Sequence, residues 1–500
     1  MWERFLYMSL FATKPVGRIL AEAESGEHRL RRTLGPGQLI ALGIGAIIGA
    51  GLFSLTGLAA AQNAGPAVVV SMVVAGFGCA LAGLCYSEFA CMIPVAGSAY
   101  TYAYATLGEW IAWIIGWDLV IEYAIGAATV SISWSAYLVS LLHSLHVELP
   151  ARWIAGPFEA VELPDGMAAP GFANLPAVLI VFLVSMLLMV GIRESARVNA
   201  AIVAIKVAVV LVFIGAGWSY INPANYHPFL PPNTGTFGSF GISGVMMGAG
   251  TIFFAYIGFD AVSTAAQECR NPQKDMPIGM FGSLAVCTVL YILFALVLTG
   301  LVPYTKLGVA APVAVAIDRT PYVWLNQLVK FGVICGFTSV ILVMLMGQSR
   351  VFYSMSRDGL VPPVFSRIHP RFHTPWRSNL LFFFFVTPFS AFLPLSVVGR
   401  MTSIGTLFAF VIVCAGIWVM RRRDPHRERP FRTPWVPAVP ILGMVANFAL
   451  MYSLGRSNWL RLAVWLVIGQ AIYFLYSRRH SRLRQAAREQ PGGSASAGRR

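Results

Sequence analysis

The sequence is poor in charge. Only 11% of its 500 residues are Asp, Glu, Lys or Arg, whereas about a quarter of a soluble domain is charged, and 57% are hydrophobic. By length the chain could form about three soluble domains. Yet apolar stretches recur from Gly37 to Tyr476 without a polar globular interval. This balance excludes water as the main solvent and predicts a single membrane domain.

Cysteine and catalytic motifs are also scarce. The seven cysteines are odd in number, lie mostly inside apolar runs and have no metal-ligand spacing. We expect them to pack as small hydrophobic side chains, with no disulfide framework and no metal site. The sequence has no HExxH, no Walker Gly-Lys-Ser/Thr, no GxSxG and no dense His/Cys/Asp cluster. We therefore predict neither an enzyme nor a nucleotide-driven pump, and no cofactor.

Long apolar stretches are what the sequence has instead. Cut at charged or Pro/Gly-rich breaks, they predict an all-α polytopic membrane protein with twelve spans of about 20 residues. The spans start near Gln38, Gly65, Trp110, Leu175, Val198, Gly241, Pro277, Trp324, Asn379, Val397, Val436 and Trp459. Residues 1–36 are predicted to be a cytoplasmic tail without a signal-peptide cleavage site. Residues 37–477 form the twelve-helix domain, and 478–500 a basic, partly disordered cytoplasmic tail.

The net charge of +15 is unevenly distributed. With the N-terminus inside, most of the 36 Lys and Arg fall in cytoplasmic segments, as the positive-inside rule requires. These segments are the leader through Arg32, Arg193 to Arg197, Arg270 to Lys274, Arg350 to Arg377, Arg421 to Arg432 and the tail from Arg478. The basic charge thus indicates topology and not nucleic-acid binding. We expect a plasma membrane location (the inner membrane in a bacterium) and cytoplasmic termini. Membrane lipids are expected partners, and Arg421 to Arg423 could contact anionic lipid, although the favoured interpretation of this run is a solvated flank.

Glycines interrupt the first and the sixth span. They are Gly43, Gly45, Gly49 and Gly51 in the first, and Gly248, Gly250 and Gly258 in the sixth. Each weakens a helix by about 1 kcal/mol relative to Ala, so the clusters permit unwinding. Unwound backbone at membrane depth persists only where protein buries it or it lines a cavity. The alternative is that the glycines only allow close helix packing.

The two interruptions are five spans apart. Corresponding elements of a five-plus-five inverted repeat would fall at that separation, and paired interrupted spans are the best pointer from sequence to a transport site.

Several separated segments resemble the amino acid-polyamine-organocation superfamily. They are Gly43 to Phe53, Pro94 to Tyr102, Gly108-Glu109, Phe253 to Thr264 and Asn271-Pro272. Further segments resemble its cationic amino acid transporter branch and the bacterial relatives of that branch: Gly116-Trp117, Glu122-Tyr123, Gly347 to Arg350 and Met355 to Leu360. The resemblance implies the leucine-transporter-like fold, with ten helices in two inverted repeats and two peripheral helices. It also implies secondary transport of amino acids by alternating access.

An amino acid carries an α-carboxylate and an α-ammonium, and each unpaired ion costs several kcal/mol to desolvate. The half-helix that begins near Ala50 offers free N–H groups and a positive dipole end to the carboxylate. Carbonyls freed at Phe254 to Ile257 would have no donor and could accept from the ammonium. With the resemblance, the expected substrate-binding residues are Ile47, Gly49, Ala50, Gly51, Phe254, Ala255, Tyr256, Ile257, Glu122, Phe337 and Thr338.

Two ionisable residues inside spans are candidates for proton coupling. Lys206 is nine residues from Arg197, roughly 13 Å deep, which is too deep for snorkelling. Its alternative role is purely structural, satisfied by carbonyls, although intramembrane ionisable groups usually serve function. The resemblance places Lys206 where sodium-coupled relatives hold a cation and so implies protons as a partner. Glu122 is one turn after Asp118, and functional and structural roles are equally open for it.

Three further questions stay open from the sequence. An ion channel is possible because glycine-broken helices also build selectivity filters, although repeated filter loops and charged rings are missing. A sodium-coupled symporter of the same fold would need a Ser/Thr cation site in place of Lys206. The bulk of Phe337 favours a free amino acid that is neutral and of small or medium size, whereas the family branch is named for cationic substrates.

Overall fold

The computed structural model describes residues 10–17, 19, 34–93, 98–162, 167–191, 196–264, 269–372 and 374–489. These residues are mainly helical, because backbone groups in an apolar surrounding must be satisfied within their own segment. The strands β1 (Ala160–Glu162) and β2 (Ala168–Pro170) form an antiparallel hairpin in which Val161 pairs with Ala169. The predicted disordered stretch 490–500 lies outside the described residues.

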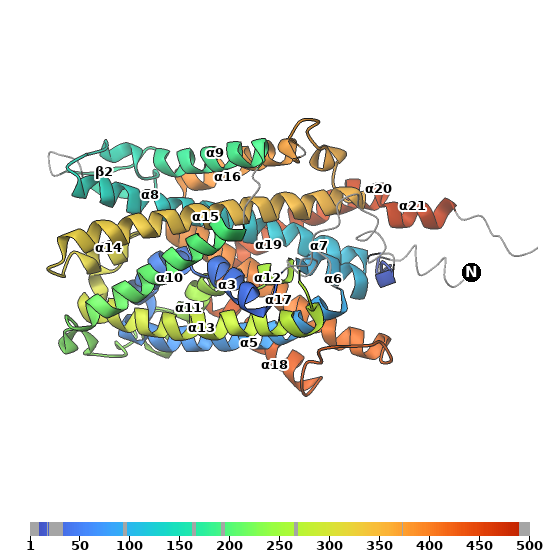
Figure 1. The fold of residues 1–500 in the computed structure, drawn as a ribbon, viewed down its shortest axis with the longest axis horizontal. Coiled ribbons are helices and arrows are strands. Elements are labelled where there is room, and N and C mark those ends of the chain that lie inside the picture. Colours follow the sequence, from blue (N-terminus) through green and yellow to red (C-terminus); the bar gives the residue numbers. More distant parts are fainter. Residues whose placement is uncertain are drawn as a thin grey trace, which may run out of the picture.

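The main helices follow the apolar runs in order (Figure 1). They are α3 (Pro36–Ile47), α4 (Thr56–Ala59), α5 (Val68–Met92), α6 (Ser98–Thr106), α7 (Glu109–Val120), α8 (Gly126–Ser144), α9 (Leu175–Val190), α10 (Ala196–Trp218), α11 (Gly241–Ile252), α12 (Ala261–Thr264), α13 (Pro272–Leu301), α14 (Pro312–Ile317), α15 (Val323–Arg357), α16 (Trp376–Phe392), α17 (Leu395–Arg423), α18 (Ala438–Ser453), α19 (Arg456–Ile472), α20 (Arg478–His480) and α21 (Arg482–Glu489). Each predicted span begins no more than five residues from the start of one of these helices.

Helix length and composition identify a polytopic membrane protein. Within the described ranges, seven helical stretches are long and apolar enough to cross a membrane. They are Gly51–Met92, Glu109–Ser144, Ala200–Trp218, Pro272–Leu301, Trp324–Arg357, Leu395–Arg423 and Arg456–Ala486. Four shorter apolar helices, α3, α9, α11 and α18, accompany them. The fold class is therefore confirmed, while the count of twelve spans stays a prediction.

The bundle has two chemically different ends (Figure 1). One end carries α6, α20 and α21, and we call it the basic end, because α20 and α21 are rich in arginine. The opposite end carries β2 and α14, and we call it the loop end. The helices α3, α11 and α12 lie in the middle of the bundle, near α13, α15 and α17 (Figure 1).

Two of the first-span glycines serve close packing inside α3. A Cβ at Gly43 would lie 2.4 Å from the Ser283 hydroxyl of α13, and one at Gly45 would lie 2.4 Å from a methyl of Val203 in α10. The packing alternative therefore holds for these two glycines. Gly49 and Gly51 follow the end of α3, so they lie at the interruption itself.

Candidate functional site

Both spans are interrupted where the glycines predict. The helix α3 ends at Ile47, Ile48 is extended, and a π-helical turn, η1 (Gly51–Leu55), resumes the chain. In the sixth span, α11 continues into the 3-10 turn η7 (Phe253–Tyr256), Ile257 is extended, and α12 follows. Each break exposes backbone groups that a continuous helix would satisfy.

The two breaks cross in direct backbone contact. A Cβ at Gly51 would lie only 2.2 Å from the Cα of Ala255, so no side chain fits there. On the other side of the crossing, Gly258 has a φ of +115° and a Cβ would lie 2.7 Å from the carbonyl oxygen of Ala46. Glycine is needed at both points for space, and at Gly258 also for the backbone conformation.

Tyr291 of α13 joins the two breaks, and we did not predict it from the sequence. Its hydroxyl lies 2.9 Å from the carbonyl oxygens of both Ile47 and Ala255, and its side chain is fully buried. One hydroxyl proton thus serves two helix ends. The only signal in the sequence was a tyrosine inside an otherwise apolar span.

The start of η1 supplies the hydrogen-bond donors of the site expected for the substrate carboxylate, which we call the carboxylate seat. Ala50 is the residue preceding this turn and is fully buried, as is Gly51. The first N–H groups of a helix have no intrahelical partner, and the dipole makes this end positive. Gly49 lies against Val340 of α15, where an added Cβ would be 3.3 Å away. These groups suit a carboxylate at the crossing.

The acceptor side differs from expectation. We predicted that the carbonyls from Phe254 to Ile257 have no donor, but Phe254 accepts from the Ile257 N–H at 3.2 Å and Ala255 accepts from Tyr291. The tight 3-10 turn and the neighbouring tyrosine supply these donors. Each carbonyl has a second lone pair, so an ammonium can still be a further donor.

Two predicted substrate-binding side chains are directed elsewhere. The Tyr256 hydroxyl donates to the carbonyl of Met72 at 3.0 Å, in α5. The Thr338 hydroxyl accepts from the Trp134 indole at 3.0 Å and donates to Ile334 within α15. Backbone groups of Tyr256 remain at the break, because it belongs to η7.

The remaining predicted side chains with apolar character are buried: they are Ile47, Phe254, Ile257 and Phe337. The Phe337 ring lies edge-on to Phe53, with ring centres 5.9 Å apart, and thereby reaches the half-helix that follows the first break.

Lys206 contacts the first interrupted span. Its ammonium donates to the carbonyl of Gly45 at 2.6 Å, and the residue is 2% exposed. Gly45 is among the last residues of α3. The last carbonyls of a helix generally have no partner within that helix. The stem of Lys206 passes Gly336 of α15, where an added Cβ would be 3.2 Å away. Lys206 therefore links α10, α3 and α15.

Glu122 lies in a second π-helical turn, η4 (Ile121–Ile125), and is 1% exposed. Its carboxyl is beside Asp260, which follows the second break, and beside Thr406 of α17. The Tyr123 hydroxyl donates to Asp260 at 3.4 Å. Two carboxyls this close repel each other when both are charged.

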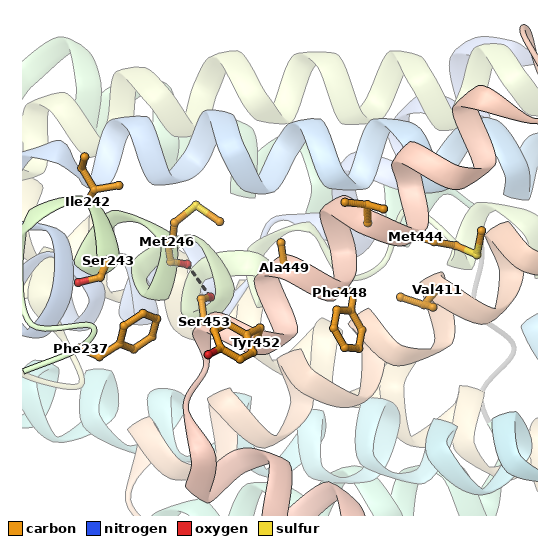
Figure 2. Close-up of a pocket in the computed structure, with 11 residues that line it drawn as sticks. Phe237, Ile242, Ser243, Met246, Val411, Met444, Phe448, Ala449, Tyr452 and Ser453 are labelled. Carbon is orange, nitrogen blue, oxygen red and sulfur yellow. Dashed lines mark hydrogen bonds between the residues drawn. The ribbon is translucent and has the colours of Figure 1, made fainter.

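A surface groove lies apart from this crossing (Figure 2). It has a volume of about 720 Å³ and is lined by α11, α17 and α18, with the Ser453 hydroxyl donating to the Met246 carbonyl at 2.9 Å. Phe448 and Tyr452 in its lining are 52% and 67% exposed. The groove therefore opens to the surroundings of the bundle and not to the helix breaks.

Paired, buried helix breaks in a polytopic helical bundle are typical of a membrane transporter. The chain belongs to the amino acid permease family, whose family model matches residues 34–473. This membership confirms the resemblance to the amino acid-polyamine-organocation superfamily.

Its relatives carry transporter names. The chain is 43% identical to a branched-chain amino acid permease of Bacillus subtilis (strain 168), covering 95% of this chain and 99% of that protein. It is 42% identical to a methylthioribose transporter of the same organism, again over 95% and 99%. It is 30% identical to the vacuolar cationic amino acid transporter 4 of Arabidopsis thaliana, over 96% and 97%. The family and these names confirm a transporter and not an enzyme.

Proposed function

We propose that this chain is a secondary active transporter that carries free L-amino acids across the plasma membrane by alternating access, as a symporter or exchanger driven by protons. The crossing of the two breaks carries this proposal. It sets the positive start of η1 next to the carbonyls of η7, so an α-carboxylate and an α-ammonium can bind side by side.

The proposed cargo is neutral, with an apolar side chain of branched-chain size. Val340 and Phe337 of α15 offer an apolar surface beside the first break. The carboxyl of Glu122 is already beside Asp260 and Thr406, so it is not reserved for a cationic side chain. The relative named a branched-chain amino acid permease supports the same choice.

Protons are the proposed coupling ion, with Lys206 and Glu122 as the groups that carry them. Lys206 holds a carbonyl at the end of α3 by its charge, so loss of its proton would weaken that link. A sodium ion has no role there while the ammonium occupies the position. We place the basic end in the cytoplasm and expect membrane lipids along it, where Arg422 lies 4.8 Å from the centre of the Trp418 ring.

The test uses purified protein in liposomes and labelled L-leucine, L-arginine and methylthioribose, with and without a pH gradient and sodium. We expect saturable L-leucine uptake that an inward proton gradient increases and sodium does not. The decarboxylated amine of leucine should compete poorly because it lacks the carboxylate, and D-leucine because it presents the same groups in the mirror-image arrangement. Equal competition by the amine would refute the proposed substrate class, and single-channel currents would indicate a channel.

A further inference from the structure

Tyr137 joins three elements at the loop-end side of the crossing. It belongs to α8, and its side chain is fully buried. Its hydroxyl donates to the carbonyl of Phe53 at 2.6 Å and accepts from the N–H of Val313 at 3.3 Å. Phe53 is in η1 and Val313 is in α14, so one hydroxyl links the half-helix after the first break to the short helix at the loop end.

The Val313 N–H needs this partner. Val313 is the second residue of α14, and N–H groups in the first turn of a helix have no partner within it. Val313 is also fully buried, so water does not replace the hydroxyl. A buried backbone N–H without a partner is rare in native proteins. The seating of α14 therefore depends on where the Tyr137 hydroxyl lies.

The helix α14 rests directly on the chain that follows the first break. A Cβ at Gly57, in α4, would lie 2.4 Å from the Cβ of Pro312 and 2.8 Å from the carbonyl oxygen of Leu307. The Pro312 ring therefore packs directly on the backbone of Gly57. Thus α14 covers the same half-helix whose first N–H groups, at Ala50 and Gly51, form the proposed carboxylate seat.

An aromatic contact holds the tyrosine in place. The Tyr137 ring lies edge-on to Phe337, with centres 5.5 Å apart, and Phe337 lies edge-on to Phe53. Phe53 follows Ala50 by three residues, about one turn of the half-helix. A tilt of this half-helix on substrate binding therefore moves the Phe53 carbonyl toward or away from the Tyr137 hydroxyl.

We propose that Tyr137 is a positioning residue that couples substrate binding on the first half-helix to closure of α14 over the loop end. The idea rests on the proposed function. With substrate bound, Phe53 and Val313 share the Tyr137 hydroxyl and α14 stays seated. When the half-helix tilts away, the hydrogen bond between the Tyr137 hydroxyl and the Phe53 carbonyl breaks. The hydroxyl is then no longer held in position to accept from the Val313 N–H, and α14 is released.

The test measures how fast a buried position of α14 becomes accessible. Ala316 is fully buried and tolerates the small change Ala316→Cys as a reporter for a membrane-impermeant maleimide. Cys335 is replaced by Ser, because the other six native cysteines are buried. In this background, Tyr137→Phe should label about tenfold faster, because it removes both hydrogen bonds of this hydroxyl and leaves the buried Val313 N–H without its partner. We call the protein that carries only Ala316→Cys and Cys335→Ser the parent. L-Leucine should slow labelling of the parent but not of the Tyr137→Phe variant.

The matched control is Tyr226→Phe, which removes a hydroxyl whose partner, the Leu296 carbonyl at 2.8 Å, belongs to α13 and not to α14. It should label at the parent rate. Equal labelling of Tyr137→Phe and the parent would overturn the proposal, and so would undiminished protection of the variant by L-leucine. A parent that labels as expected but takes up no amino acid would instead count against the proposed function.

A second measurement needs no variant. In hydrogen–deuterium exchange on the unmodified protein, peptides covering η1 and α14 should gain protection together when L-leucine is added. Protection of η1 alone would show that α14 is not coupled to the seat.

Discussion

At the scale of the residue, Lys206 is a buried ionisable group in direct contact with the first interrupted span. Its ammonium holds the Gly45 carbonyl. We expect Lys206→Ala to abolish accumulation driven by a pH gradient, because the charge disappears and a buried carbonyl loses its donor. The measurement is uptake in liposomes with an imposed gradient.

The control for this change is Lys330→Ala. Lys330 is also 2% exposed, but it bonds to Ser144 and Asp318 at the loop end. It should keep the pH response. If Lys206→Ala, inserted normally, accumulates substrate with an undiminished response, its coupling role is wrong.

Glu122 calls for a substitution that keeps its shape. Glu122→Gln preserves hydrogen bonding beside Asp260 and Thr406 but cannot exchange a proton. We expect a changed pH profile of uptake between pH 5 and 8 at unchanged protein abundance. The exposed Glu148→Gln is the control and should leave the profile as it is. An unchanged profile in Glu122→Gln would assign the carboxyl a structural role.

A substitution of Tyr291 tests whether its hydrogen bonds at the crossing contribute to substrate binding. Tyr291→Phe removes the hydroxyl that contacts Ile47 and Ala255 and keeps the ring. The loss of one buried hydrogen bond, about 1 kcal/mol, should weaken substrate affinity roughly five- to tenfold, because both helix ends gain freedom. Binding is measured by competition in detergent. An unchanged affinity would mean that packing alone holds the breaks together.

The sequence predicted backbone features of the site better than side-chain directions. Glycine clusters identify breaks because their effect on a helix is local. The partners of Tyr291, Tyr256 and Thr338 come from other helices, at separations that no local pattern encodes. Their orientation therefore became known only from the fold.

At the scale of the element, apolar length predicted where the helices begin, but not that the C-terminal tail docks. Arg484 of α21 is 5% exposed and donates to Glu109 at 2.7 Å. Glu109 also accepts from Tyr473 at 3.0 Å and Tyr104 at 3.2 Å. A basic, polar tail has the composition of a solvated segment, so the buried carboxylate that holds it could not be anticipated.

This contact leads to a stability prediction. Arg484→Ala leaves the Glu109 carboxylate buried without its cation, and breaking such a pair costs about 3–5 kcal/mol. We expect easier proteolysis at Arg478 and Arg479 and a lower thermal unfolding temperature in detergent. The control Arg482→Ala removes an exposed arginine from the same helix and should have little effect. Equal protease resistance in both variants would show that α21 does not depend on the pair.

At the scale of the whole molecule, charge distribution is the property that orients the bundle. The ends of a membrane helix that carry Lys and Arg stay in the cytoplasm, and the effect sums over short flanking segments. The basic end includes Arg421, Arg422 and Arg423 at the end of α17, and the arginines of α20 and α21. The uneven distribution of the net charge of +15 is therefore the basis on which we predict the orientation.

The orientation is tested with two reporter cysteines in intact cells, in the Cys335→Ser background. Thr305→Cys lies at an exposed position of the loop end, and Gln485→Cys at an exposed position of α21. We expect a membrane-impermeant maleimide to label Thr305→Cys in intact cells and Gln485→Cys only after the membrane is permeabilised. The two positions also serve as controls for each other, because permeabilised cells should label both. Labelling of Gln485→Cys in intact cells would show that the orientation is opposite to the predicted one. The direction in which protons move in the proposed coupling through Lys206 would then be opposite as well.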